Sequence, residues 1–133
     1  RVKHEFAKGG NYTVKLVVDD LRGTPCSTAV DMVNVTFNTA PIACASGANG
    51  CVGEAIQFDG TGSSDADGDA LSYNWDFGDG ETGTGAQPTH AYSKGGCYNV
   101  TLTVDDGKGT DCSTGCNGTR VTINSAPVAA GMI

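Results

Sequence analysis

Several residue types that build helices are scarce in this chain of 133 residues. Leucine, glutamate and lysine are few, whereas 20 glycines and many threonines, asparagines and aspartates favour strands and turns. The chain has no apolar run long enough to cross a bilayer, so we expect no membrane insertion of this segment. Arg1 does not begin a signal peptide, so a signal for export would lie outside this chain.

Positive charge is also scarce. The chain has 8 lysines and arginines against 15 aspartates and glutamates, which gives a formal net charge of −7. This balance disfavours nucleic acid and anionic membrane surfaces as partners. It suits hard cations, which bind carboxylate and carbonyl oxygens. A hydrophobic fraction of 38% is still enough for a packed core.

The sequence lacks the motifs of common enzymes. It has no H-E-x-x-H, no serine near a base and no phosphate loop. Its two histidines, His4 and His90, occupy the same repeat position, two residues before Phe6 and Tyr92 respectively. A residue that recurs at one position of a repeat is more often structural than catalytic. We therefore expect that this chain is not an enzyme.

The sequence repeats itself at a spacing of 86 residues without a gap. The longer match aligns HEFAKGGNYTVKLVVDDLRGTPCST (4–28) with HAYSKGGCYNVTLTVDDGKGTDCST (90–114). The shorter match aligns VTFNTAPIA (35–43) with VTINSAPVA (121–129). Self-similarity at a fixed period indicates a tandem array.

The period divides the chain into three parts at its two N-x-A-P segments. We expect the C-terminal half of a preceding repeat at 1–37, a complete repeat at 38–123, and the linker and first strand of a following repeat at 124–133. The half repeat should present an apolar face and an open edge that something must cover. Either the natural chain continues upstream, or another molecule donates the missing strands.

Apolar and polar residues alternate along several short segments of the complete repeat. The apolar sets are Tyr98, Val100, Leu102 and Val104; Leu71, Tyr73 and Trp75; Ile56 and Phe58; and Val121 and Ile123. Glycine, aspartate or asparagine bounds each run, and residues 104–111 carry the best hairpin signal. The pattern predicts an all-β protein built as an Ig-like antiparallel β-sandwich.

Six cysteines, none of them in a C-x-x-C pair, favour disulfides over a zinc site and indicate an oxidising compartment. Cys51 with Cys97 is one candidate pair, and Cys112 with Cys116, or either of these with Cys44, is another. Cys26 is a candidate for a bond to a neighbouring repeat or molecule. The connectivity does not follow from the sequence.

Four asparagines begin an N-x-T sequon and are candidates for N-glycosylation. They are Asn11, Asn34, Asn99 and Asn117. The first three fall on the polar phase of their predicted strands, where a glycan would meet solvent. Together with the cysteines, they predict a secreted protein that is extracellular or at the cell surface.

Residues 38–123 contain S-S-D-A-D-G-D, W-D-F-G-D-G, H-A-Y and Y-N-V-T-L-T-V-D, in this order. This series strongly resembles the polycystic kidney disease (PKD) repeat family, and the half repeat keeps the last two motifs with Phe6 for the tyrosine. The resemblance implies Ig-like domains, usually in tandem on extracellular proteins. Such domains occur in surface-layer and adhesion proteins and beside catalytic domains of secreted proteases, collagenases and polysaccharide hydrolases. The cysteines and the longer segment 110–118 depart from the pattern.

The aspartates of the two central motifs have different expected roles. Asp76 and Asp79 flank glycines, so their side chains should cap turns by accepting from nearby backbone N–H groups. In D-A-D-G-D, Asp65, Asp67 and Asp69 alternate beside a glycine that permits a tight turn, so their oxygens can converge.

The sandwich topology should bring this loop to the same pole as Asn38 and as Asp105 or Asp106. The resemblance implies calcium here, because some PKD-like domains of secreted collagenases bind it with residues that match Asn38, Asp65 and Asp67. Such a calcium ion would be structural and would stiffen the joint between repeats. The alternative is that the aspartates only form solvated turns.

The expected function is a non-catalytic structural repeat in a stalk, filament or surface layer, stabilised by disulfides, glycans and, if it binds, calcium. Its partners would be neighbouring repeats or copies of the same protein. One alternative is an accessory module that holds collagen or polysaccharide for a secreted hydrolase. Such a surface usually exposes aromatic residues, but aromatics make up only 7% of this chain and most fall on the buried phase of their strands, with Phe77 as the candidate exception. The other alternative is homotypic adhesion through exposed strand edges.

Overall fold

The structure, a computed structural model, describes residues 1–127, which form strands joined by turns and loops. The strands are β1 (Gly10–Asp19), β2 (Thr28–Phe37), β3 (Ser46–Gly47), β4 (Gly50–Cys51), β5 (Ala55–Asp59), β6 (Ser72–Asp76), β7 (Thr82–Thr84), β8 (Thr89–Ala91), β9 (Gly96–Asp105) and β10 (Thr114–Asn124). They make a two-stranded sheet β1-β2, a five-stranded sheet β4-β10-β9-β6-β7 and a three-stranded sheet β3-β5-β8. Among the described residues, no helix is long and apolar enough to pass through a lipid bilayer.

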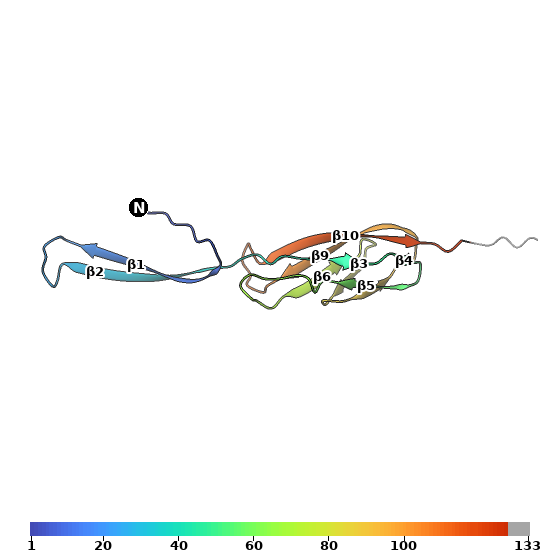
Figure 1. The fold of residues 1–133 in the computed structure, drawn as a ribbon, viewed down its shortest axis with the longest axis horizontal. Helices are drawn as coiled ribbons and strands as arrows, with labels where there is room; N and C mark the ends of the chain where they lie inside the picture. Colours follow the sequence, from blue (N-terminus) through green and yellow to red (C-terminus); the bar gives the residue numbers. More distant parts are fainter. Residues whose placement is uncertain (128–133) are drawn as a thin grey trace, which may run out of the picture.

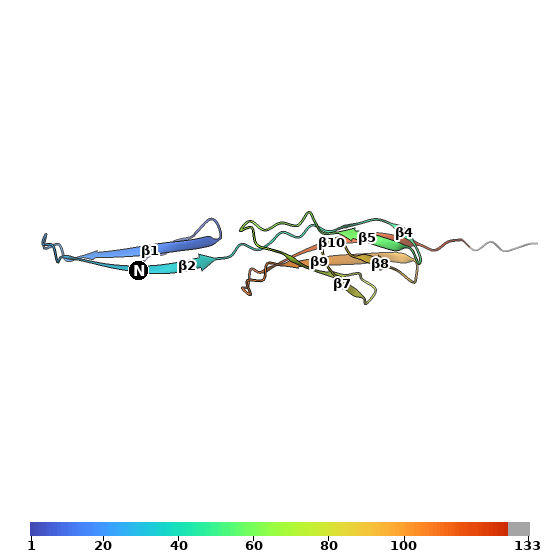
Figure 2. The ribbon, with the colours of Figure 1, turned by 90° about the horizontal axis from the view of Figure 1, so that it is seen from below.

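The five-stranded and three-stranded sheets pack against each other around one hydrophobic core (Figures 1 and 2). Alternation along β9 places Val100, Leu102 and Val104 in this core, and all three are fully buried. Trp75 lies directly opposite Leu102 on the neighbouring strand β6 and contacts Phe58 of the other sheet. The expected all-β sandwich is therefore confirmed for the complete repeat.

The β1–β2 hairpin lies beyond one end of the sandwich, along the same long axis (Figures 1 and 2). Its register pairs Val14 with Val33 and Tyr12 with Val35, so one face is largely apolar. Leu16 on this face is 60% exposed, whereas Leu102, its equivalent in the complete repeat, is fully buried. Within residues 1–127, the hairpin thus has the sequence of a core face without a second sheet over it.

The hairpin nevertheless has the same local geometry as β9 and β10. Three features recur at the 86-residue spacing: a tyrosine hydroxyl that donates to a lysine carbonyl, a glycine of positive φ, and an aspartate that caps the following turn. The tyrosine hydrogen bonds are Tyr12 to Lys8 O (2.9 Å) and Tyr98 to Lys94 O (2.8 Å). The glycines are Gly10 (φ 142°) and Gly96 (φ 147°). The capping aspartates are Asp19, which accepts from Leu21 N at 2.7 Å, and Asp105, which accepts from Gly107 N at 2.7 Å. The hairpin therefore keeps the local geometry of β9 and β10, although no second sheet covers it within residues 1–127.

The expectation that Phe77 lies outside the buried set was wrong. Phe77 is 2% exposed and stacks on the ring of His90, with the centroids 4.2 Å apart and the planes 3° from parallel. Although strand β6 ends at Asp76, Phe77 keeps the odd-numbered phase of Tyr73 and Trp75, so the alternation already indicated a buried side chain there.

All six cysteines are exposed free thiols in the structure. Cys51 and Cys97 lie at one end of the five-stranded sheet, opposite Asn124 and Thr122 of β10 respectively. The backbone carbonyl of Cys112 lies at the other end and accepts a hydrogen bond from Asn38. Disulfide formation by any of the six stays a prediction.

The four sequon asparagines are exposed on strands. Asn11 and Asn34 lie on the polar face of the hairpin, where each accepts a hydrogen bond from a threonine hydroxyl of the opposite strand. Asn117 differs, because its side-chain oxygen accepts from Ala45 N at 3.1 Å. Glycosylation at these positions stays a prediction.

The two equivalent leucines provide a matched test of the fold. Leu102→Ala should lower the free energy of unfolding by about 2 to 5 kcal/mol, because it leaves a cavity in a packed core. Leu16→Ala should cost less than about 1 kcal/mol, because its side chain is exposed. Urea unfolding of the full chain, followed by circular dichroism, measures both. Equal losses would show that another molecule or segment buries Leu16 in solution.

Candidate functional site

Three aspartates converge at the end of the sandwich that faces the hairpin. Asp65 and Asp69 come from the D-A-D-G-D loop between β5 and β6, and Asp106 follows β9. One carboxylate oxygen from each lies within 4.8 Å of the others. Asp65 Oδ1 accepts from Asp67 N at 2.8 Å, whereas Asp65 Oδ2 is buried and has no hydrogen-bond partner. A buried, unpaired carboxylate oxygen is costly unless a cation or a donor meets it.

Two side chains offset part of this negative charge. Lys108 Nζ lies 2.9 Å from Asp69 Oδ1, and this contact raises the pKa of the lysine. Asn38 Nδ2 donates to Asp106 Oδ2 at 2.6 Å. Burial alone would raise the pKa of Asp106, but hydrogen bonds from Asn38 and from Lys108 N outweigh it and hold this pKa below its usual range.

The other two predicted ligands lie outside this group. Asp67 turns toward the linker, where its Oδ2 accepts from Thr39 N at 2.7 Å. Asp105 caps the turn after β9 by accepting from Gly107 N at 2.7 Å. The structure thus brings together Asp65, Asp69 and Asp106, with Asn38 on Asp106, and uses Asp67 and Asp105 elsewhere.

The donor set of this aspartate cluster suits a hard cation. It offers carboxylate oxygens, one of them buried and unpaired, and no nitrogen or sulfur ligand. A hollow of about 440 Å³ opens beside it, lined by Asn38, Asp69 and Lys108 and by residues of the hairpin end. Of the three clustered aspartates, Asp69 faces this hollow, whereas Asp106 and Asp65 Oδ2 lie buried behind it.

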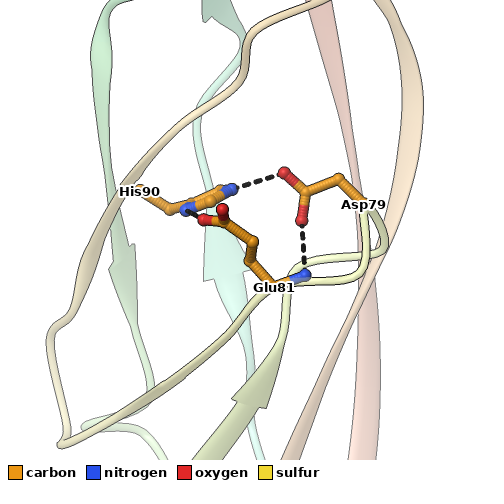
Figure 3. A group of neighbouring side chains, drawn as sticks. All are labelled: Asp79, Glu81 and His90. Carbon is orange, nitrogen blue, oxygen red and sulfur yellow. Dashed lines mark hydrogen bonds and ion pairs between the residues drawn. The ribbon is translucent and has the colours of Figure 1, made fainter.

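A second polar cluster lies beside the three-stranded sheet and centres on His90 of β8 (Figure 3). His90 Nε2 lies 2.7 Å from Asp79 Oδ2, a hydrogen-bond distance at which the ring N–H donates. His90 Nδ1 lies 3.6 Å from Glu81 Oε2. Asp79 also accepts from Glu81 N at 3.0 Å, so one carboxylate caps the W-D-F-G-D-G turn and holds the histidine.

The surroundings of His90 indicate a structural role, and we call His90, Asp79 and Glu81 the staple. Its ring stacks on buried Phe77 and meets Tyr92 edge-on. Tyr92 donates its hydroxyl to Phe77 O at 2.9 Å, and burial, together with the charge of Asp79, raises its pKa to about 12. The cluster therefore ties the turn after β6 to the strand that contains H-x-Y.

Sequence reasoning found part of this second cluster. Turn capping by Asp76 and Asp79 is confirmed, since Asp76 accepts from Gly78 N at 2.9 Å. The contact of Asp79 and Glu81 with His90 was missed, because no local spacing links a turn to a strand of the other sheet. The available signal was that W-D-F-G-D-G and H-x-Y stand together in one motif series.

The His90 contact predicts a specific acid sensitivity. Partial burial opposes ionisation of Asp79, but hydrogen bonds from His90 and Glu81 N outweigh it, so its pKa lies below the ordinary 3.8. The ionised form therefore stabilises the fold above pH 3.8, and this contribution is lost as the pH falls through the lower folded-state pKa. Asp79→Asn should cost about 1 to 2 kcal/mol near neutral pH and nothing in acid.

Melting temperatures of the wild type and the variant across pH measure this difference. Glu81→Gln is the control, because Glu81 is 73% exposed and should have little effect. A difference between wild type and Asp79→Asn that stays constant down to the lowest pH would contradict the assignment.

Comparisons with known proteins agree with this fold. The PKD domain family matches residues 38–123. Collagenase ColA of Clostridium perfringens (strain 13 / Type A) is 42% identical over 109 residues, which are 81% of this chain and 9% of that protein. The crystal structure of the PKD1 domain from Vibrio cholerae metalloprotease PrtV has a TM-score of 0.55 and 38% identity, and the match covers 64% of this chain and 98% of that domain.

A structure from work on the promiscuous specificity of carbohydrate-binding modules from the β-sandwich superfamily is also similar. Its TM-score is 0.61 at 30% identity, over 67% of this chain and 36% of that one. The present chain thus spans less than a tenth of the collagenase and almost the whole of a PKD1 domain. A PKD domain is a non-catalytic module. On its motifs, its sandwich and these matches, the chain belongs to the PKD domain family.

Proposed function

We propose that this chain is a non-catalytic structural segment of an extracellular or cell-surface protein, in which PKD domains follow one another end to end as a stalk, filament or surface layer. The observation that carries the proposal is the hairpin 1–37. It has the sequence and local geometry of the hairpin that ends the complete domain, and it lies in line with that domain (Figure 1).

The division of the chain into 1–37, 38–123 and 124–133 is part of this proposal, although residues 128–133 lie outside the described part of the chain. The apolar face of the hairpin supports it. Phe37 and Leu16 are 43% and 60% exposed, whereas their equivalents Ile123 and Leu102 are buried beneath the β3-β5-β8 sheet. In an array, an equivalent sheet of a preceding domain covers this face.

The outer face of the five-stranded sheet also supports a structural role. A shallow hollow on it is lined by Trp75, which is only 1% exposed, by Gly83, and by six polar residues: Asn74, Asp76, Thr82, Thr84, Thr101 and Thr103. The aromatic side chains of the described sandwich are buried or half-buried instead. A polymer-binding surface usually presents exposed aromatic rings, and this face has none among the described residues.

Similarity to a collagenase and to a metalloprotease domain supports a location outside the cytoplasm, as do the cysteines and sequons. The same relatives support a second candidate function. In it, the chain is the accessory module of a hydrolase and holds collagen or polysaccharide. The similarity to a carbohydrate-binding module structure favours the polysaccharide form of this candidate.

Pull-down on insoluble collagen, chitin and cellulose separates the two functions. We expect the full chain to stay in the supernatant, because its outer face offers polar side chains without aromatic rings. The unfolded chain is the control for non-specific adsorption. Retention of the folded chain by one polymer, with saturation and with release by the soluble fragment of that polymer, would replace the structural function by the accessory one.

We also propose that the aspartate cluster binds calcium. Asp65, Asp69 and Asp106 would hold the ion, and Asn38 would stand beside them. The bound charge would meet the unpaired Asp65 Oδ2 and reduce the repulsion among the carboxylates. Because Asn38 belongs to the linker, the ion would also fix the linker to the sandwich. Lys108 competes, since it already contacts Asp69.

Calcium titration by calorimetry tests this site. Asp65→Asn should weaken binding by about tenfold or more, because it removes a charged ligand. Lys108→Ala should strengthen binding, because it removes the competing cation. Asp31→Asn is the charge-matched control, because Asp31 is an exposed aspartate of β2 outside the cluster; this variant should bind as the wild type does, with the same rise in melting temperature. No heat and no change in melting temperature for the wild type would exclude calcium.

A further inference from the structure

A contact of three residues joins the hairpin to the sandwich. Gly9 N donates to Thr39 Oγ1 at 3.1 Å, and Thr39 N donates to Asp67 Oδ2 at 2.7 Å. Gly9 lies in the loop before β1, Thr39 in the linker after β2, and Asp67 in the D-A-D-G-D loop of the sandwich. Thr39 of the linker thus forms hydrogen bonds to the hairpin and to the sandwich at the same time.

This contact requires a glycine at position 9. A Cβ there would lie 2.4 Å from Asp67 Oδ1 and 2.5 Å from Thr39 Oγ1. A Cβ at position 9 would force the Asp67 carboxylate or the Thr39 hydroxyl to shift, and we expect this shift to weaken the hydrogen bonds that join hairpin, linker and sandwich. The hydrogen bonds of Thr39 therefore join the hairpin to the sandwich, and Gly9 leaves room for the Asp67 carboxylate beside them.

Two of these three residues recur at the opposite end of the sandwich, at the 86-residue spacing. A Cβ on Gly95 would lie 2.5 Å from Ser125 Oγ, as one on Gly9 would from Thr39 Oγ1. The loop around Gly95 is held like the loop around Gly9, because Tyr98 donates to Lys94 O as Tyr12 donates to Lys8 O. Ser125 keeps the hydroxyl of Thr39 one residue after the asparagine of N-x-A-P.

We propose that Gly95 and Ser125 form the receiving half of an inter-domain joint, and that its partner is the D-x-D-G-D loop of a PKD domain that follows Asn124. This inference rests on the proposed end-to-end array. A carboxylate placed as Asp67 is placed would accept from the backbone N–H and the hydroxyl of Ser125. Gly95 admits it because it carries no side chain.

The joint sets the mechanics of the array. In each linker, the residue at the position of Thr39 or Ser125 forms hydrogen bonds to the domain before it and to the domain after it. Neighbouring domains therefore keep one relative orientation. The array is then a stiff rod instead of a chain of beads on free linkers. The partner loop is specific, because the joint needs a carboxylate at the position of Asp67 and a glycine in the facing loop.

The existing chain tests the half of the joint that is present. Residual dipolar couplings of backbone N–H groups should fit one alignment tensor for hairpin and sandwich together in the wild type. Gly9→Ala and Asp67→Ala should each give two different tensors, with the sandwich couplings unchanged within themselves. Gly118→Ala is the matched control, because a Cβ there has its nearest neighbour, Val100 O, at an ordinary 3.7 Å. One shared tensor in both joint variants would overturn the joint.

An extended chain tests the receiving half. Residues 124–133 occupy the places of 38–47, so adding a second copy of residues 48–123 after Ile133 completes a following domain on the full chain. The two sandwiches should share one alignment tensor. Gly95→Ala in the first copy, or Asp67→Ala in the second copy, should each give the two sandwiches different tensors. Gly118→Ala in the first copy should leave the shared tensor unchanged.

The outcomes distinguish this inference from the proposed function. Two folded sandwiches with independent tensors in the unchanged extended chain would overturn the joint, yet an array with flexible links would stand. Failure of the structural function would appear instead as saturable retention on a polymer, whatever the tensors show. A shared tensor that Gly95→Ala leaves intact would also overturn the joint, because another contact would then hold the domains.

Discussion

Contact between Trp75 of β6 and Phe58 of β5 connects the two sheets of the domain, and the other features depend on it. Their ring centroids are 5.6 Å apart, and both side chains are almost fully buried. Because β5 leads into the D-A-D-G-D loop and Trp75 lies beside Leu102 of β9, this packing brings Asp65 and Asp106 to one pole. The same packing sets β8 beside the turn after β6, where His90 meets Asp79.

The two polar clusters handle negative charge in different ways. In the staple, Asp79 meets the ring N–H of His90 and a backbone N–H, so each of its oxygens has a donor. In the aspartate cluster, three carboxylates share one lysine, one side-chain amide and a few backbone N–H groups, and Asp65 Oδ2 has no partner. The first arrangement is complete within the protein. The second leaves negative charge uncompensated, which is why only the second supports a proposal of calcium.

The sequence predicted the core of residues 38–123 well, because strict alternation along a strand directly reports which side chains are buried. Val100, Leu102 and Val104 follow this rule. Phe77 also follows it, since it continues the odd-numbered phase of Tyr73 and Trp75 and is buried; the expectation that it lies outside the buried set departed from the rule. Turn capping at Asp76 was also predictable, because it depends only on residues two positions away.

Side-chain directions in the D-A-D-G-D loop were not predictable in the same way. Spacing alone makes Asp65, Asp67 and Asp69 equally good candidates for metal ligands. A tertiary contact with Thr39 turns Asp67 toward the linker, whereas Lys108 meets Asp69. The pairing of His90 with Asp79 likewise depends on how two sheets pack. Such contacts join residues that are distant in the chain, and no local pattern encodes them.

The hairpin geometry that β1–β2 shares with β9–β10 bears on the order in which a domain assembles. Pairing β9 with β10 closes a short loop, and the entropy cost of closing a loop rises with the logarithm of its length. By contrast, the segment before β3 reaches β10 only across most of the domain, since Asn117 accepts from Ala45 N. The β3-β5-β8 sheet precedes β10 in the chain, so during synthesis β6 and β9 cover only part of its apolar side until β10 has emerged. Completion of each core therefore waits for its last strand, and the hairpin that ends a domain is the step that closes it.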